Sequence, residues 1–310
     1  MILVLGSSGF LGTNVCKLLE KSCVKYAGAS LSTGTDLRIK SDVDKLFSAV
    51  KPSIVINCAS FVGGLQFGLA HPTELFVNNM QITLNIYQAL EKYSTSKIIN
   101  PISNCTYPGK LSLFKVDEWW DGPMHESVLI YGLTKKALWV ASQAYNTDFG
   151  ISANHIILPN MYGTGDHKDE ERAHALGALI SKFVKAKLEG STKVIVWGTG
   201  SPIREWLHVR DGAQALVRSI PLDLGRDPVN VGRGQGISIK DLAHKIREIV
   251  DVDCEICFDP SKPDGAPMKT IDGSTGASKL GWVPEIDLDS GLHETISAYF
   301  NEIDKNNYGL

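Results

Sequence analysis

A glycine-rich segment directly after the first apolar run most constrains how this chain can fold. Residues 2–5 are predicted to form a short buried strand, and a helical pattern begins at residue 10. The connecting segment consists of Gly6, Ser7, Ser8, Gly9, Phe10, Leu11 and Gly12. Between a strand and a helix, glycines let the backbone approach a diphosphate, while the helix N-terminus offers free N–H groups. We predict that this segment binds a dinucleotide; the simpler alternative is a glycine-rich turn without a ligand.

Short β-branched runs alternate with amphipathic stretches through the first half of the chain. Strands are predicted at 2–5, 24–29, 53–58, 97–102 and 152–158, and helices at 10–21, 41–50, 73–92 and 131–148. This alternation predicts an α/β fold built on a doubly wound parallel sheet.

The pattern changes after about residue 160. A charged loop at 166–172 precedes a predicted helix at 173–188, a strand at 194–197, a loop at 232–236 and a helix at 238–250. We predict a dinucleotide-binding domain over residues 1–160, to which the chain returns near 205–235. Residues 161–310 are expected to form mainly a smaller C-terminal substrate lobe.

Composition and charge argue against several classes of protein. The net charge of −3 argues against nucleic-acid binding, and no apolar run is long enough to span a membrane. The N-terminus lacks the features of a signal peptide, so a cytoplasmic protein is expected. Six cysteines in 310 residues do not indicate a disulfide framework. Cys254 and Cys257 are expected on a strand, where residues three apart face opposite sides, so we predict no metal site.

The end of the second predicted strand bears on the choice of cofactor. An acid there would favour NAD by binding the ribose 2′-hydroxyl, but residues 27–32 contain none. Small polar residues leave room for a 2′-phosphate, for which Arg38 and Lys40 are candidate cations. We therefore predict NADPH. Asp36 and Leu37 are expected to follow a third strand and to lie against the adenine.

A Tyr-x-x-x-Lys pair carries the first candidate chemistry. Tyr131 and Lys135 lie one turn apart on a predicted helix, and Ser103 ends a predicted strand upstream. A tyrosine can protonate a carbonyl oxygen while hydride arrives at its carbon, and a nearby lysine is expected to lower the tyrosine pKa. Ser103 can bond the substrate carbonyl. Such spacing also occurs by chance on surface helices, but the glycine segment and the strand-end serine favour a catalytic role.

A second candidate set is Cys105, two residues after Ser103, with His174 as a possible partner. A neighbouring cation can turn a cysteine into a base strong enough to remove a proton from carbon. Cys105 as a buried structural thiol and His174 as a surface histidine are the alternatives. Together the two sets suggest an enzyme that both epimerises and reduces a keto sugar.

With these motifs, the chain resembles the extended short-chain dehydrogenases/reductases along its whole length, and among them the GDP-L-fucose synthase family. Four stretches carry the closer resemblance: 103–108, 160–163 with His174 beyond them, 196–209 and 262–282. The resemblance implies a Rossmann-type domain and a nucleoside-diphosphate 4-keto-6-deoxy sugar, GDP-linked in this family, as substrate. It also implies a homodimer formed through helices 73–92 and 131–148.

The resemblance also implies roles residue by residue. The catalytic residues would be Ser103, Tyr131 and Lys135 for reduction, and Cys105 and His174 for epimerisation. Cofactor contacts would include Ala59, Asn160 and Met161 beside the glycine segment, Asp36, Leu37, Tyr131 and Lys135. Substrate contacts would be Lys182, Trp197, Arg204 and Asp272.

Some positions depart from the family pattern and keep alternatives open. Asn104 stands where a serine is usual, Met268 where an arginine is common, and the loop after Gly163 is unusual. One alternative is a 4-reductase of a related hexose or heptose with a single epimerisation or none. Another is a dinucleotide-sensing protein without catalysis, although a sensor has no need of a proton donor such as Tyr131.

Overall fold

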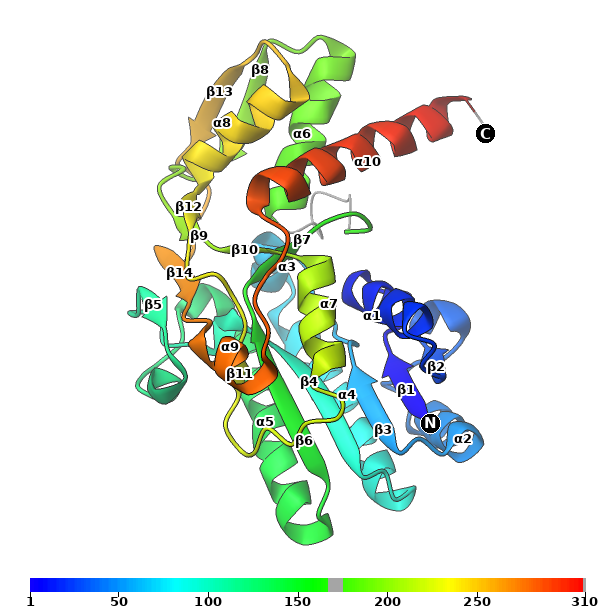
Figure 1. Cartoon of the computed structure of the whole chain (residues 1–310). Coiled ribbons are helices and arrows are strands. Elements are labelled where there is room, and N and C mark those ends of the chain that lie inside the picture. Colours follow the sequence, from blue (N-terminus) through cyan, green and yellow to red (C-terminus); the bar gives the residue numbers. More distant parts are fainter. Residues whose placement is uncertain (167–174, 309–310) are drawn as a thin grey trace.

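The computed structural model describes residues 1–166 and 175–308, with side chains described as far as Asn301. The central feature of this part of the chain is a six-stranded parallel sheet with the order β11-β6-β4-β3-β1-β2 (Figure 1). Its strands are β1 (Ile2–Leu5), β2 (Tyr26–Ala29), β3 (Ile54–Asn57), β4 (Lys97–Ser103), β6 (Ser152–Leu158) and β11 (Val229–Asn230). Helices cover both faces of the sheet, so β1 is buried along its whole length.

Successive residues of β1 show how the two helical layers form. Leu3 packs with Phe47, Ile86 and the other apolar residues of one core cluster, whereas Val4 belongs to the opposite cluster. Helices α2 (Lys40–Val50), α4 (Pro72–Lys92) and α5 (Leu129–Phe149) cover the first face. Helices α1 (Phe10–Lys21) and α7 (Val209–Arg218) cover the other. The predicted doubly wound parallel sheet is confirmed.

The predicted third strand before Asp36 is wrong. After β2 the chain enters a single 3₁₀ turn, η1 (Leu31–Thr33), and then a turn to α2, so β2 is the edge of the sheet. The hydroxyls of Ser30 and Thr33 satisfy local backbone and side-chain partners, and Gly34 has a φ of +87°. Hydroxyl side chains that bond their own turn compete with strand pairing.

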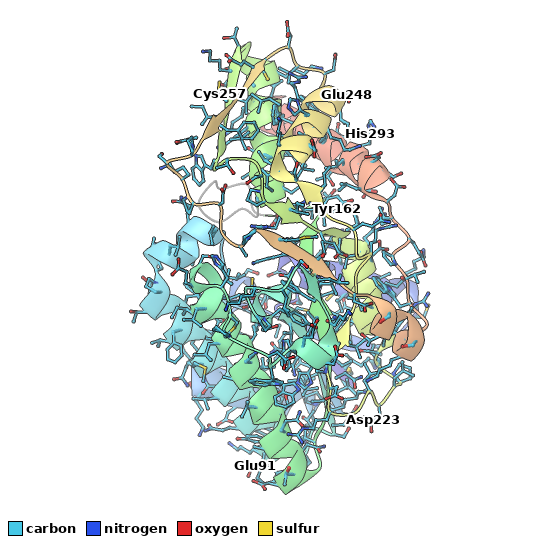
Figure 2. All side chains as sticks on the ribbon, turned by 90° about the vertical axis from the view of Figure 1, so that its left-hand side faces the viewer. Glu91, Tyr162, Asp223, Glu248, Cys257 and His293 are labelled. Carbon is cyan, nitrogen blue, oxygen red and sulfur yellow. The ribbon has the colours of Figure 1, made fainter. Side chains whose placement is uncertain are left out.

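A second lobe lies beyond the carboxyl edge of the sheet (Figure 1). Its core joins the parallel pair β8 (Lys193–Trp197) and β13 (Glu255–Asp259) to helices α6 (Ala175–Glu189), α8 (Ile239–Val250) and α10 (Leu288–Tyr308). The predicted strand at 194–197 and helix at 238–250 are confirmed, as is the described part of the helix at 173–188. Cys257 lies on β13 at the far end of this lobe, and Tyr162 lies near the junction with the sheet (Figure 2). Among the described helices, none is long and apolar enough to cross a membrane.

Shorter elements connect the two parts. They are α3 (Leu65–Ala70), β5 (Leu113–Phe114), β7 (Asn160–Tyr162), β9 (Ile203–Arg204), β10 (Trp206–His208), β12 (Ile237–Ser238), β14 (Met268–Ile271) and α9 (Ser274–Leu280), with the 3₁₀ turns η2 (Asn104–Thr106), η3 (Val116–Glu118) and η4 (Glu126–Val128). Strands β12, β9, β14 and β5 form a small sheet, and β10 pairs with β7.

Glu205 holds this junction together. Its buried carboxylate accepts hydrogen bonds from the backbone N–H groups of Ile271 at 2.7 Å, Gly234 at 3.2 Å and Arg233. Burial raises the pKa of Glu205 to about 7, against the opposing effect of these three donors. Two segments distant in sequence, 233–234 and 271, therefore share one acceptor.

We expect Glu205→Ala to lower the free energy of unfolding by about 2–5 kcal/mol, because the buried N–H of Ile271 and the part-buried N–H groups of Arg233 and Gly234 lose their acceptor. Urea denaturation followed by circular dichroism measures the change. Glu255→Ala is the matched control, because Glu255 is exposed and paired with Lys193 at 3.3 Å on the surface. Its effect should stay within about 0.5 kcal/mol. Equal effects of the two substitutions would contradict the role of Glu205.

Candidate functional site

The glycine segment folds as a tight turn against two strands. The N–H groups of Gly6 and Ser7 donate to the carbonyl of Ala29 at 2.8 and 3.1 Å, which ties the turn to the end of β2. A Cβ on Gly12 would lie 2.0 Å from the carbonyl oxygen of Gly6, and one on Gly6 would lie 2.8 Å from the nitrogen of Ala59. Only glycine fits at these two positions, where α1 starts beside β1 and β3.

The N-terminus of α1 is available to an anion. Gly9 is its N-cap residue and provides no side-chain cap, and the first turn holds no acidic residue. The first N–H groups of a helix carry a partial positive charge and lack partners within the helix. Among the described residues, the loop therefore has the close backbone approach and the open donors that a diphosphate requires.

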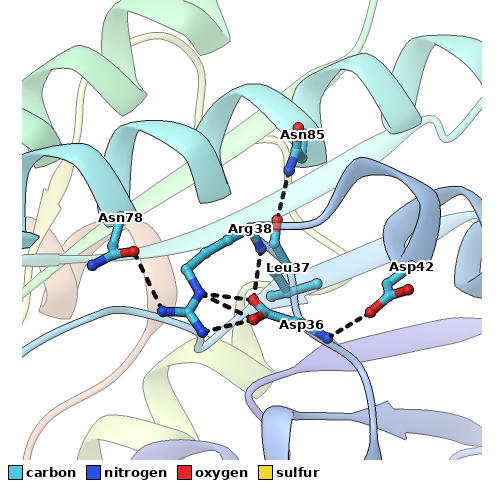
Figure 3. Close-up of polar contacts among 6 residues, drawn as sticks. All are labelled: Asp36, Leu37, Arg38, Asp42, Asn78 and Asn85. Carbon is cyan, nitrogen blue, oxygen red and sulfur yellow. Dashed lines mark hydrogen bonds and ion pairs between the residues drawn. The ribbon is translucent and has the colours of Figure 1, made fainter.

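Hydroxyl groups surround the end of β2, where an adenosine ribose would lie. Ser8 and Ser32 are hydrogen-bonded through their hydroxyls at 2.7 Å, and Ser32 also bonds Ser30 at 3.1 Å. Figure 3 shows the neighbouring pair, in which the Asp36 carboxylate accepts from Arg38 Nε at 2.9 Å and from Nη2 at 2.6 Å. The guanidinium of Arg38 holds the pKa of Asp36 below its usual range. Arg38, a candidate cation for the 2′-phosphate, is engaged by Asp36.

Leu37 is buried beside this pair, and its carbonyl accepts from Asn85 Nδ2 at 2.9 Å (Figure 3). Arg38 Nη1 also reaches the Asn78 amide oxygen at 3.4 Å. Two residues of α4 thus fix the loop that contains Asp36 and Leu37, in place of the strand that the sequence predicts.

Ser103 and Tyr131 lie at the carboxyl edge of the sheet, where ligands bind in open α/β folds. Ser103 is the last residue of β4, and its hydroxyl accepts from the backbone N–H of Cys105 at 3.2 Å. Tyr131 is in the first turn of α5, and Lys135 Nζ lies 5.6 Å from its ring centroid. The Tyr131 hydroxyl is hydrogen-bonded to Ser60 at 3.4 Å.

Burial dominates the electrostatics of this pair. It raises the pKa of Tyr131 to about 12 and lowers that of Lys135 to about 8. The net shift of the Tyr131 pKa is upward, opposite in direction to the effect expected of Lys135, because desolvation is its largest cause. The phenol is protonated near neutral pH, which is the form that can donate to a carbonyl oxygen.

The first turn of α5 brings Cys105 close to Tyr131. A Cβ on Gly132 would lie 2.6 Å from the carbonyl oxygen of Cys105, so a glycine at this position lets turn η2 pack against the helix. Lys269 Nζ lies 3.5 Å from the Cys105 sulfur, and its side chain is buried. Lys269 could not be predicted from the sequence, because its approach to Cys105 depends on the pairing of β14 with β5 and β9. The fold thus places a lysine side chain directly beside the Cys105 thiol.

The predicted substrate residues form two groups in the described structure. Lys182 Nζ lies 4.7 Å from the ring centroid of Trp197, and Lys262 Nζ lies 5.6 Å from the same ring. Arg204 donates to the carbonyl of Asp264 at 3.0 Å, and burial lowers its pKa. Trp197 and Arg204 both lie within the stretch 196–209 that the sequence analysis singled out.

Asp272 lies apart from these groups, and its carboxylate accepts from the N–H of Ser274 at the start of α9. Asp264, which sequence reasoning missed, accepts from Thr199 N at 2.8 Å and lies beside Arg204. A cavity of about 540 Å³ adjoins it, lined by Leu69, His125, Glu126, Ser127, Pro263, Asp264 and Gly265.

The remaining predicted cofactor contacts lie around the carboxyl edge of the parallel sheet. Asn160 and Met161 are on β7, where Asn160 Nδ2 donates to the carbonyl of Glu205 at 3.3 Å. Ala59 follows β3 against Gly6. His174 lies outside the described residues.

The chain belongs to the NAD dependent epimerase/dehydratase family, whose model matches residues 2–232. It is 33% identical to GDP-L-fucose synthase 1 of Arabidopsis thaliana over 97% of this chain and 94% of that protein. GDP-L-colitose synthase of Yersinia pseudotuberculosis is 30% identical, with 99% of both chains covered. The resemblance to the GDP-L-fucose synthase family is thereby confirmed.

The fold is similar to that of a GDP-mannoheptose C4 reductase from Campylobacter jejuni, solved with NADP bound. The TM-score is 0.85 at 25% identity, over 96% of this chain and 98% of that chain. The similarity includes both the sheet and the second lobe.

We expect Gly12→Ala to abolish dinucleotide binding or folding, because the new methyl group would overlap the carbonyl oxygen of Gly6. Titration of NADPH fluorescence measures binding, and circular dichroism reports folding. Gly68→Ala is the control, since a Cβ there meets only Leu75 Cδ1, at 3.7 Å. The variant should bind as the wild type does and gain up to about 1 kcal/mol of stability. Unchanged NADPH binding by Gly12→Ala would contradict the assignment of the loop.

Proposed function

We propose that this protein is an NADPH-dependent epimerase and reductase of a GDP-linked 4-keto-6-deoxy sugar. The single observation that carries this proposal is the common placement of two reactive groups, the neutral Tyr131 phenol and the Cys105 thiol beside Lys269. The names of the relatives, which include a GDP-L-fucose synthase and a GDP-L-colitose synthase, support the substrate class.

The cofactor assignment rests on the glycine segment and the end of β2. Gly6 to Gly12 would hold the diphosphate, Asp36 and Leu37 would lie at the adenine, and Ala59, Asn160 and Met161 would line the nicotinamide side. Residues 30–35, directly after β2, contain no acid, and the hydroxyls of Ser8 and Ser32 leave room for a 2′-phosphate. The reductase solved with NADP bound supports the same choice. On this proposal residues 1–160 form the cofactor domain, and the second lobe binds the nucleotide-sugar.

In the reduction step, Tyr131 donates its proton to the C-4 oxygen, which Ser103 orients. NADPH, when bound, supplies the hydride. Lys135 offsets the charge that develops on the phenol and holds the nicotinamide ribose. Arg204, Lys182 and Trp197 hold the diphosphate and a ring of the nucleotide-sugar, for which guanidinium forks and aromatic faces are suited. Asp272 is the fourth proposed contact.

In the epimerisation step, Cys105 removes a proton from C-3 or C-5, which the 4-keto group acidifies. The buried side chain of Lys269 lies beside this base, with its Nζ 3.5 Å from the Cys105 sulfur. His174 returns a proton from the opposite face.

A 4-reductase without epimerisation is the second candidate, favoured by the similarity to a GDP-mannoheptose C4 reductase. A sensor without catalysis would need neither Tyr131 nor Lys269.

We place the protein in the cytoplasm as part of this proposal. All six cysteines lie in the described residues and are free thiols, which is usual in a reducing compartment.

The deciding experiment measures proton exchange at carbon and hydride transfer to C-4 in the same reaction. A GDP-4-keto-6-deoxy sugar is incubated with NADPH in deuterated water, and NMR locates deuterium in the product. Wild-type enzyme should place deuterium at C-3, C-5 or both. Cys105→Ser should stop this incorporation while hydride transfer to C-4 continues, because Ser103, Tyr131 and Lys135 remain. Cys257→Ser, on β13 away from the site, should match the wild type (Figure 2). Reduction by wild-type enzyme without deuterium would leave the plain 4-reductase.

Tyr131→Phe tests the proton donor. The variant should fold and bind NADPH, since only a hydroxyl is removed, and its kcat for NADPH oxidation should fall by roughly 10²–10⁴-fold. Spectrophotometry at saturating sugar measures kcat. Turnover close to that of the wild type would refute the role of Tyr131.

A homodimer through α4 and α5 is the proposed assembly. These helices pack together and expose apolar residues, namely Phe76, Val77 and Leu84 on α4 and Leu129, Leu133 and Val140 on α5. An exposed apolar face of this kind is typical of a protein interface. Leu133→Glu should convert a dimer to a monomer in light scattering after gel filtration, because the partner would bury an unpaired charge. Val283→Glu, at another exposed position, should leave the mass unchanged. A monomeric wild type would overturn the assembly.

A further inference from the structure

We infer that Ser60 is a further catalytic residue of the reduction, the hydroxyl that stabilises Tyr131 after it has given up its proton. This inference rests on the proposed function, because it concerns the same proton donor. Ser60 follows β3 at the carboxyl edge of the sheet, and no motif in the sequence drew attention to it.

Ser60 is the only described side chain that hydrogen-bonds the Tyr131 hydroxyl, at an oxygen–oxygen distance of 3.4 Å. Its own hydroxyl donates to the amide oxygen of Asn79, on α4, at 3.0 Å. A serine hydroxyl carries one hydrogen and two acceptor sites. In the protein alone, that hydrogen therefore points to Asn79, and an acceptor site of Ser60 faces the neutral phenol.

The orientation of the Asn79 amide is fixed by its neighbours. Its nitrogen donates to the carbonyls of Phe61 and Leu75, both at 2.7 Å. Its oxygen accepts from the backbone N–H of Phe61 at 3.0 Å in addition to Ser60. Asn79 is buried, so a flipped amide would leave these backbone groups without partners. The Asn79 oxygen thus has a second donor and does not depend on Ser60.

The Ser60 hydroxyl can therefore donate its hydrogen to either of two acceptors, the amide oxygen of Asn79 or the oxygen of Tyr131. Once Tyr131 has passed its proton to the substrate oxygen, the phenolate has no hydrogen to give and needs one to accept. Rotation of the Ser60 hydroxyl turns its hydrogen from Asn79 to the phenolate, and the Asn79 oxygen keeps the N–H of Phe61. No bond to hydrogen breaks at Ser60, so its proton stays in place throughout. Lys135 acts through its charge, with its Nζ 5.6 Å from the centroid of the Tyr131 ring, whereas Ser60 makes the direct hydrogen bond.

Ser60→Ala tests this role with the full-length enzyme, NADPH and a GDP-4-keto-6-deoxy sugar. A hydrogen bond to a charged group is lost, so kcat should fall by about 10- to 100-fold with little change in either KM. Ser60→Thr keeps the hydroxyl and should restore most of the rate. In the Tyr131→Phe background, Ser60→Ala should cause no further loss, because the phenol it serves is absent.

The outcomes distinguish a failure of the role of Ser60 from a failure of the proposed function. A wild-type rate for Ser60→Ala overturns the role of Ser60 and leaves the proposed function standing. A further fall in the Tyr131→Phe background also overturns it, since Ser60 would then act through the loop or through cofactor binding. Failure of the wild-type enzyme to reduce any such sugar overturns the proposed function, and the role of Ser60 with it.

Discussion

The buried carboxylate of Glu205 is the contact on which the shape of the site depends. Its neighbour Arg204 is on β9, and the carboxylate holds β14, which carries Lys269, together with the turn at 233–234. Neither strand is long enough to be stable through its ladder alone. The Glu205 carboxylate therefore sets where Lys269 and Arg204 lie relative to Cys105. The three N–H donors offset the cost of burying this carboxylate.

The parallel sheet supplies the other half of the site by a different route. Because all its strands run the same way, the loops after β1, β3 and β4 meet at one edge. These loops carry the glycine turn, Ser60 and Ser103. The small sheet that connects the two parts adds Lys269 and Arg204. Residues of the parallel sheet are placed by its strand order, whereas Lys269 and Arg204 are placed by the pairing of β14 with β9.

Much of this arrangement could be predicted from the sequence, because long periodic segments specify their own structure. The strands at 2–5 and 152–158 and the helix at 10–21 have the predicted bounds. Helix α7 was missed because its N-cap is His208, whose side chain accepts from the N–H of Arg210 and is not a usual capping signal. Ser103, Tyr131 and Cys105 belong to local motifs, which is why the sequence predicts them as site residues. Lys269 and Ser60 could not be predicted in this way, because their proposed roles depend on contacts distant in sequence.

The electrostatics of Tyr131 also bear on the order of the two proposed reactions. The protons at C-3 and C-5 are acidic only while C-4 is a ketone, so exchange at carbon has to precede reduction. A phenol whose pKa is raised to about 12 by burial is a weaker acid than an ordinary tyrosine. In the proposed reaction, such a donor would give up its proton less readily, so the ketone would remain while Cys105 acts at C-3 or C-5. The shared placement of Cys105 and Tyr131, made possible by Gly132, thus fits a sequence in which the ketone persists until epimerisation is complete.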